Sequence, residues 1–212
     1  MESIKGRFAP SPTGRMHLGN AFCALLAWLS ARSQGGRLLL RMEDLDPQRS
    51  RERYARMLME DLLWMGLDWD EGAGIPGEEE KQYWQSRREE EYAKALDLLK
   101  WQELLYPCFC TRAELHAAEA PHASDGQVIY SGRCRELTME ERQEKEKHRR
   151  PAIRIRVPDE MISFTDGCRG VYEENLAWDC GDFILRRSDG VFAYQLAVTW
   201  DDGVMGVSQV VR

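Results

Sequence analysis

Residues 7–20, RFAPSPTGRMHLGN, combine residue types that suit the binding of a phosphate group. The prolines and small residues end a preceding strand, and a helix is expected from Asn20 onward, so unpaired backbone N–H groups would face an anionic ligand. Gly19 permits close approach of the backbone, since a side chain there would occupy the space of the ligand. His17 and Asn20 can each donate to a phosphate oxygen whose charge grows in a transition state. A short HLGN string is weak by itself, because a histidine before a helix often serves only as a cap or a surface residue.

A second polar group follows the next expected strand, in the segment RMEDLDP of residues 41–47. In doubly wound sheets, ligands collect outside the carboxyl ends of the strands. We therefore expect Glu43 to lie on the same edge of the sheet as the loop of residues 9–14. The alternative for Glu43 is a solvated carboxylate beside Arg41.

Three cysteines, Cys108, Cys110 and Cys134, fall in one short irregular segment. The chain is expected to be cytosolic, where thiols stay reduced, so clustered cysteines indicate a metal rather than disulfides. Three thiolates suit a structural zinc ion that holds together a module too small for its own core. His116, His122 or a water could supply the fourth ligand, and the alternative is three buried cysteines without a metal. The other cysteines are expected to be packing residues: Cys23, Cys168 and Cys180.

The composition and net charge of the chain exclude several classes of protein. The 212 residues are 43% hydrophobic, which is enough for a buried core in one domain with an insertion or in two small domains. No run of about 18 apolar residues and no secretory signal is present, so we expect neither a membrane span nor export. The formal charge of −7 argues against indiscriminate nucleic-acid binding, which needs a broadly basic surface. A cytoplasmic protein without a membrane partner is expected.

The hydrophobic pattern supplies the elements that must position these groups. A strand over residues 4–9, a helix that ends at Gly35-Gly36 and a strand over 37–42 form a βαβ unit, whose crossover makes the two strands parallel. Two further helices are predicted over residues 50–66 and 78–103. Residues 152–157 alternate as a strand, two strands are expected around the turn at 188–190, and a last strand covers 206–212. We divide the chain into residues 1–105, an inserted zinc-binding module at 106–150, and a continuation at 151–212.

Four blocks in order carry a resemblance that covers nearly the whole chain: RFAPSPTGRMHLGN, RMEDLDPQR, FTDGCRG and GVMGVSQVVR. Together they resemble the class I aminoacyl-tRNA synthetases of the glutamyl group. His17 to Asn20 would occupy the HIGH-type motif, with Asn20 in place of its last histidine. The resemblance implies an α/β class, with a Rossmann-like nucleotide-binding fold and an inserted zinc-binding module.

The resemblance also implies the ligands and their residues. The substrates would be ATP with Mg²⁺, L-glutamate and a tRNA, with His17 and Asn20 catalytic. The residues that would bind ATP are Pro10, Pro12, Thr13, Gly14, His17, Gly19 and Asn20. Those that would bind glutamate are Arg7, Ala9, Ser11, Glu43, Tyr194 and Arg212. Arginines suit the carboxylates because the guanidinium pairs with them through two hydrogen bonds, and Glu43 suits the ammonium. For Tyr194 the alternative is a packed core aromatic.

Within this group, the pattern C-x-C followed by Y-x₃-C is similar to that of the glutamyl-queuosine tRNA(Asp) synthetases, which implies Cys108, Cys110, Tyr130 and Cys134 as zinc ligands. The spacer between Cys110 and Tyr130 is longer than is usual there. The resemblance implies a ligase-type enzyme that activates glutamate and transfers it to queuosine in the anticodon of tRNA(Asp). A monomer is expected.

The chain departs from the family because it stops at Arg212, before the KMSKS-type loop, so we expect a fragment or a truncated relative. One alternative is a fragment of a glutamyl-tRNA synthetase that charges tRNA(Glu). Another is an inactive RNA- or ligand-binding relative. A small-molecule adenylyltransferase would explain the first motif but neither the cysteine pattern nor RMEDLDP.

Overall fold

The computed structural model describes residues 4–76, 80–111, 113–114 and 129–212. The chain divides into two compact units, the first made of residues 1–95 and 194–212 and the second of residues 96–193. Each unit is described by itself below. In the described part of the chain, no helix is both long enough and apolar enough to cross a bilayer.

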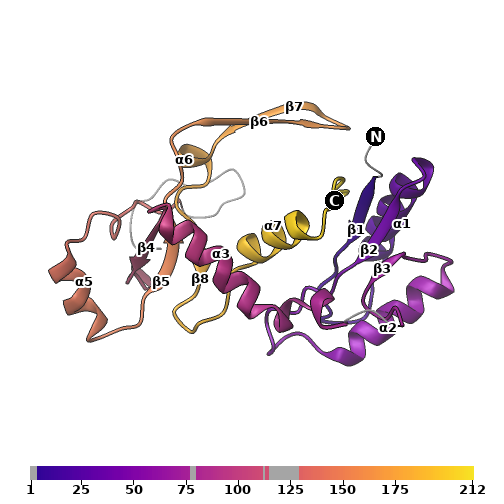
Figure 1. The fold of residues 1–212 in the computed structure, drawn as a ribbon, viewed down its shortest axis with the longest axis horizontal. Coiled ribbons are helices and arrows are strands. Elements are labelled where there is room, and N and C mark those ends of the chain that lie inside the picture. The colour runs from indigo at the N-terminus through magenta and orange to yellow at the C-terminus, as the bar shows by residue number, and fades with distance from the viewer. Residues whose placement is uncertain (1–3, 77–79, 112, 115–128) are drawn as a thin grey trace. The chain divides into compact units, whose positions relative to one another are not determined.

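The first unit is built on a parallel sheet (Figure 1). Strand β1 (Lys5–Phe8) leads through a loop into helix α1 (Leu18–Ser33), which returns the chain to β2 (Arg37–Leu40). The two strands are parallel, with Arg7 opposite Leu39, and the short β3 (Glu71–Gly72) adds to the far side of β2. The predicted βαβ unit is confirmed. The helix ends as expected, with Gly35 at φ 64°, a left-handed conformation that glycine adopts without strain.

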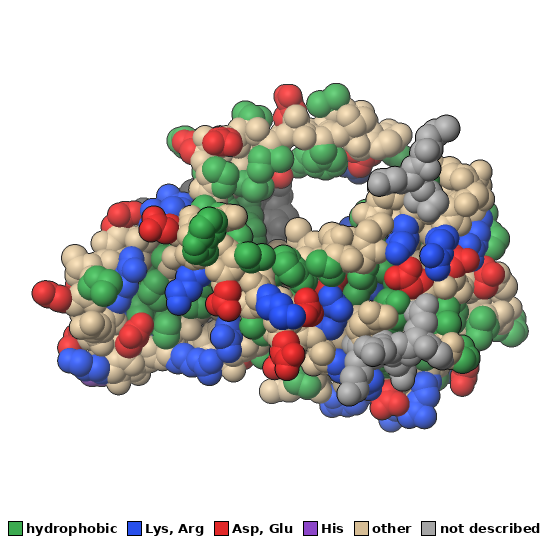
Figure 2. All heavy atoms as spheres, in the orientation of Figure 1, with side chains coloured by type: hydrophobic (Ala, Val, Ile, Leu, Met, Phe, Trp, Pro, Cys, Tyr) green, Lys and Arg blue, Asp and Glu red, His purple; other side chains and the backbone are tan. Residues whose placement is uncertain are grey.

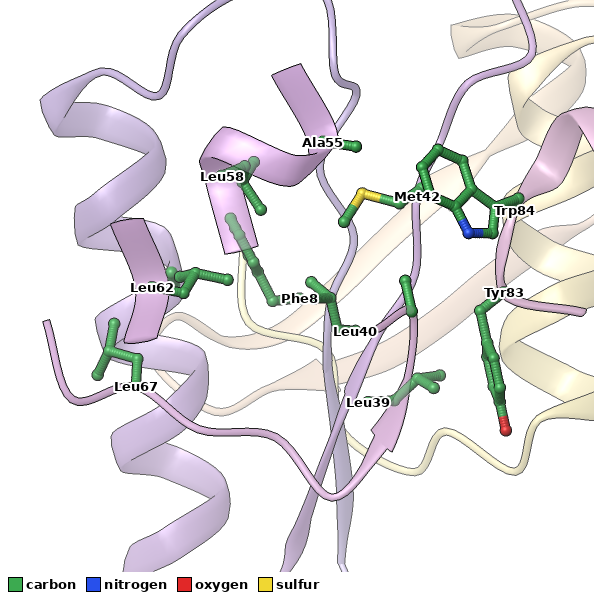
Figure 3. Packing of buried hydrophobic residues seen from close by; sticks show 12 residues of the cluster. Phe8, Leu39, Leu40, Met42, Ala55, Leu58, Leu62, Leu67, Tyr83 and Trp84 are labelled. Atoms are coloured by element: carbon green, nitrogen blue, oxygen red, sulfur yellow. The ribbon is translucent and has the colours of Figure 1, made fainter. Parts of the chain in front are cut away.

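The core of this unit lies between the sheet and helix α2 (Glu52–Trp64). Figure 3 shows Phe8 and Leu40 of the sheet packed with Leu58 and Leu62 of α2. The leucines of α2 are four residues apart, so they share one face of the helix, and both are almost fully buried. This packing fixes the carboxyl ends of β1 and β2, where the predicted ligand-binding residues begin.

The prediction of one helix over residues 78–103 is wrong in its first part. The described residues form two short 3₁₀ turns, Glu80–Tyr83 and Gln85–Arg87, before α3 (Glu89–Trp101) begins. Between the turns the backbone pairs with the end of β2, because Met42 N–H donates to Tyr83 O at 2.8 Å and Gln85 N–H donates to Met42 O at 3.0 Å. This pairing buries Trp84 and is incompatible with a continuous helix.

Two strands predicted near the C-terminus are also wrong in extent. The turn at 188–190 follows β8 (Ile184–Arg186), but its return consists of a single bridge from Arg186 to Phe192, and residues 194–204 form helix α7 (Tyr194–Val204). Leu196, Ala197 and Asp201 are buried at the spacing of one helix face. Residues 206–212 are likewise not a full strand, since they contribute one bridge, Gly6 to Gln209.

The second unit contains an antiparallel sheet in the order β4 (Leu105–Cys108), β5 (Ala152–Ile155) and β8. Helix α5 (Met139–Glu146) precedes β5, and a hairpin of β6 (Met161–Asp166) and β7 (Gly170–Asn175) leads into the short α6 (Leu176–Asp179). Exposed apolar side chains are visible along the hairpin in Figure 2, where blue and red side chains also intermingle over the face shown. The face in view has no broad basic surface, in agreement with the acidic composition.

Candidate functional site

The loop between β1 and α1 places His17 at the N-cap of the helix. Its Nδ1 accepts a hydrogen bond from the backbone N–H of Gly19 at 3.1 Å, while its own backbone N–H donates to Asn20 Oδ1 at 3.3 Å. Because Nδ1 acts as the acceptor, the proton of a neutral ring is on Nε2. The cap therefore leaves Nε2–H of His17 and the amide NH₂ of Asn20 as donors. Both side chains can serve as the phosphate donors that the sequence predicts.

Gly19 has a second reason to be glycine besides the close approach of a ligand. A Cβ atom at this position would lie 3.1 Å from Cε1 and 3.2 Å from Nδ1 of His17. Any side chain at position 19 would therefore push against the imidazole. The small residue keeps the ring in its capping position, and with it the direction of Nε2–H.

The loop that follows β1 is tied to the segment that follows β2. Glu43 N–H donates to Pro10 O at 2.9 Å, and Arg51 N–H donates to Pro12 O at 3.0 Å. Pro12 is buried, whereas Ser11 and Thr13 are exposed and Gly14 is half-buried. The expectation that Glu43 and this loop share one edge of the sheet is met, because the backbone of one bonds the backbone of the other.

Buried charges gather at this edge. Arg41 is fully buried, and its guanidinium lies 3.1 Å from Glu43 Oε1 and 2.7 Å from Asp202 Oδ1. Nε of Arg7 lies 3.3 Å from the same Asp202 oxygen. Burial raises the pKa of Glu43, although the charges of Arg41 and Arg7 oppose that rise. Glu43 is 7% exposed, so the solvated alternative for this residue is wrong.

Tyr194 and Arg212 belong to the same neighbourhood. The guanidinium carbon of Arg212 lies 5.7 Å from the centroid of the Tyr194 ring. Burial and the charge of Glu43 raise the pKa of Tyr194, while Arg212 and Arg7 act in the opposite direction. The tyrosine is 36% exposed and is not a packed core residue. The structure thus brings Arg7, Glu43, Tyr194 and Arg212 together, with Ala9 directly after β1, and their part in glutamate binding stays a prediction.

Sequence reasoning missed Asp201 and Asp202, which α7 presents to this group. Asp201 is fully buried and accepts from Gln85 at 3.0 Å, Arg88 at 2.8 Å and Tyr92 at 2.8 Å. Burial is the main reason that the pKa of Tyr92 is raised, and the negative charge of the nearby Asp201 carboxylate raises it further. Two adjacent aspartates inside an otherwise apolar segment were the available signal, but they point to this site only when the segment is read as a helix.

The cysteine cluster of the second unit is a group of side chains that could hold a metal ion. The thiol sulfurs of Cys108, Cys110 and Cys134 lie within 4.8 Å of one another. Sγ of Cys110 is 3.6 Å from that of Cys134, and the Tyr130 hydroxyl lies 3.5 Å from Cys108 Sγ and 3.7 Å from Cys110 Sγ. A tetrahedral zinc ion with sulfur at about 2.3 Å and oxygen at about 2.0 Å requires separations of roughly 3.7 Å and 3.5 Å. The three separations given above are close to these values, so the side chains are placed where they could hold such an ion.

The Tyr130 hydroxyl also accepts a hydrogen bond from the backbone N–H of Cys134 at 2.8 Å, which holds it toward the thiols. Burial raises the pKa of the Cys110 thiol to about 11, and a bound cation would favour the thiolate, which is the form that ligates a metal. His116 and His122, the alternative fourth ligands, lie outside the described residues. Cys168 and Cys180 are exposed, so the expectation that they are packing residues is wrong, while Cys23 packs against the core of the first unit.

Comparisons with known proteins agree on one family. Residues 3–212 match the family of tRNA synthetases class I (E and Q), catalytic domain. The chain is similar to the Glutamyl-Q tRNA(Asp) synthetase of Nitratidesulfovibrio vulgaris, with 56% identity over 99% of the chain and 65% of the relative. The protein of the same name from Symbiobacterium thermophilum is 51% identical over 98% of the chain and 64% of the relative.

Among solved structures, a glutamate tRNA ligase from Elizabethkingia meningosepticum in complex with its amino acid is similar, with a TM-score of 0.79 and 32% identity. That alignment covers 99% of this chain and 43% of the ligase. The chain therefore spans about two thirds of the length of the first two relatives and less than half of the ligase.

Proposed function

This chain belongs to the class I tRNA synthetases for glutamate and glutamine, and from that premise we propose that it activates glutamate with ATP and transfers it to queuosine in the anticodon of tRNA(Asp). The observation that carries the proposal is the joint placement of Arg7, Glu43, Tyr194 and Arg212 beside the loop that ends at His17. The names of the two relatives favour tRNA(Asp) and queuosine.

In the proposed reaction the α-carboxylate of glutamate attacks the α-phosphorus of ATP, and pyrophosphate leaves. Arg7 and Arg212 supply guanidinium groups for the substrate carboxylates, and Glu43 supplies a negative charge for the ammonium. Nε2–H of His17 and the amide of Asn20 stabilise the phosphate oxygens as negative charge grows on them. Mg²⁺ bound to ATP would neutralise further phosphate charge. The mixed anhydride is then attacked by a hydroxyl group of the RNA, with release of AMP.

The test is ATP–pyrophosphate exchange with glutamate in the absence of tRNA, followed by transfer of labelled glutamate. Exchange without tRNA, and transfer to queuosine-containing but not to unmodified tRNA(Asp), are the expected results. Exchange that depends on tRNA(Glu), with charging of that tRNA, would instead support a glutamate–tRNA ligase, the activity named for the similar solved structure. Glutamate and ATP binding without exchange would support the inactive relative.

We also propose that Cys108, Cys110, Tyr130 and Cys134 hold a structural zinc ion. Three of their separations support this, since 3.5, 3.6 and 3.7 Å are close to the edges of a zinc tetrahedron. The ion would supply stability to the second unit and no chemistry to the reaction. Metal analysis of protein purified without chelators should give close to one equivalent of zinc. Less than about half an equivalent would contradict the site.

A further inference from the structure

Arg154 is a buried cation beside the cysteine cluster, and its environment differs from that of the other buried arginines. The residue is 5% exposed and lies on β5 directly opposite Tyr106 of β4. Two residues that lie opposite each other on neighbouring strands have their side chains on the same face of the sheet. Residues two positions apart along one strand also share a face. Arg154 therefore emerges on the same face as Cys108, which is two residues after Tyr106.

Arg154 contacts Tyr130, one of the proposed zinc ligands. Its guanidinium carbon lies 3.8 Å from the centroid of the Tyr130 ring, within the range of a cation–π contact. One terminal nitrogen donates to the backbone oxygen of Asp182 at 2.6 Å.

Within the described part of the chain, Arg154 has no carboxylate partner. Among the described residues no Asp or Glu oxygen lies within 4.0 Å of its guanidinium, and its Nε is buried without a hydrogen-bond partner. The carboxylate of the neighbouring Asp182 is already used by Tyr106, Arg135 and the backbone N–H of Val157. By contrast, the other buried arginines of the described chain, Arg7 and Arg41, each pair with Asp202.

A buried charge is unfavourable unless an opposite charge compensates it. A zinc ion with three thiolates carries a net charge of −1, and ionisation of the tyrosine would make it −2. We propose that Arg154 is the counter-ion of this metal–thiolate centre and raises its affinity for zinc. The inference rests on the proposed zinc site, but it adds a residue that is not a ligand.

The test compares Arg154→Met with the wild type and with Arg156→Met. Arg156 is a matched control because it lies two residues along, above the Tyr106 ring at 5.8 Å, and pairs with the exposed Glu136. Zinc affinity is measured by competition with a chromophoric chelator, and thiolate ligation is followed by the charge-transfer absorption of the cobalt-substituted protein. Arg154→Met should weaken zinc binding by about 10- to 100-fold, the usual effect of losing a group that supports metal ligands. Arg156→Met should not.

A second pair of variants separates charge from folding. Arg154→Lys keeps the positive charge, whereas Arg154→Gln keeps a hydrogen-bond donor without the charge, and the lysine variant should bind zinc at least about tenfold more tightly. Equal affinity of this pair, or wild-type affinity in a folded Arg154→Met protein, overturns the proposal. A wild-type protein that binds neither zinc nor cobalt overturns the zinc site itself, so the two failures are distinguishable.

Discussion

Asp202 forms an ion pair with Arg7, in which the guanidinium Nε lies 3.3 Å from one carboxylate oxygen. The contact uses the Nε edge of Arg7 and leaves the terminal NH₁ and NH₂ groups to meet a ligand carboxylate. The same Asp202 oxygen lies 2.7 Å from the guanidinium of the fully buried Arg41, which in turn contacts Glu43. One aspartate of α7 thus positions both signs of charge in the proposed glutamate site.

Replacing Asp202 with Asn removes the charge that holds Arg7 while keeping the size of the side chain. We expect the KM for glutamate in ATP–pyrophosphate exchange to rise at least about tenfold, equivalent to roughly 1.4 kcal/mol, with little change in the KM for ATP. Asp189→Asn is the control, because that aspartate pairs with Arg187 in an exposed turn. An unchanged KM for glutamate in the Asp202 variant would show that Asp202 does not position Arg7.

His17 has two roles that different substitutions separate. Asparagine is a good N-cap residue and can accept the Gly19 N–H bond, but it cannot place a donor where Nε2 lies. His17→Asn should therefore keep the stability of the protein and lower the exchange rate at least about tenfold. His17→Ala should lose the same activity and, in addition, about 1 kcal/mol of unfolding free energy. Wild-type exchange in either variant removes the catalytic role assigned to this residue.

Gly19→Ala tests whether the direction of the imidazole matters. The new Cβ would lie 3.1 Å from the ring, so the ring must move. We expect exchange to fall by about tenfold or more while the melting temperature changes little. Gly167→Ala serves as the control, because a Cβ there meets nothing within 4 Å. Full activity of Gly19→Ala would mean that the ring position is not critical.

Glu43 should make stability depend on pH in a direction opposite to that of an ordinary paired carboxylate. Burial raises its pKa above the usual 4.5, so the folded state binds the proton more tightly than the unfolded state. The free energy of unfolding should then fall as the pH rises from about 4.5 through the folded-state pKa of Glu43. Comparison of wild type with Glu43→Gln by urea unfolding isolates this contribution. A difference between the two proteins that grows in favour of wild type over that interval would contradict the shift.

Tyr130→Phe tests the identity of the fourth zinc ligand. Loss of the hydroxyl removes both the oxygen near the thiols and the acceptor of the Cys134 N–H bond. Zinc affinity should fall at least about tenfold, whereas His116→Ala and His122→Ala should bind zinc like the wild type. A loss confined to one of the histidine variants would identify that histidine as the ligand.

Local patterns were sufficient to predict the βαβ unit, because its apolar runs and the Gly35-Gly36 stop are contiguous in the sequence. The segment around Trp84 was mispredicted because its density of charged residues is typical of an exposed helix. What decides its conformation is backbone pairing with Met42, about forty residues away along the chain. Long-range pairing of this kind leaves no local signal.

The residues of the candidate site also divide into those that the local sequence indicates and those that it does not. His17, Glu43 and the cysteines stand out by residue type and spacing, but Asp202 lies between two segments that were predicted as strands and was assigned to no element. Arg154 was hidden for another reason. In the alternating segment AIRIRV, burial of the isoleucines is the simple expectation, and nothing local indicates that one arginine faces inward.

The bonds from Asp201 to Arg88 and Tyr92 join positions more than one hundred residues apart, with the whole second unit between them. During synthesis, the guanidinium groups of Arg41 and Arg88 emerge from the ribosome long before the aspartates that neutralise them. The amino-terminal half of the first unit therefore completes its interior only after helix α7 has been synthesised, when the residues of the second unit have already left the ribosome.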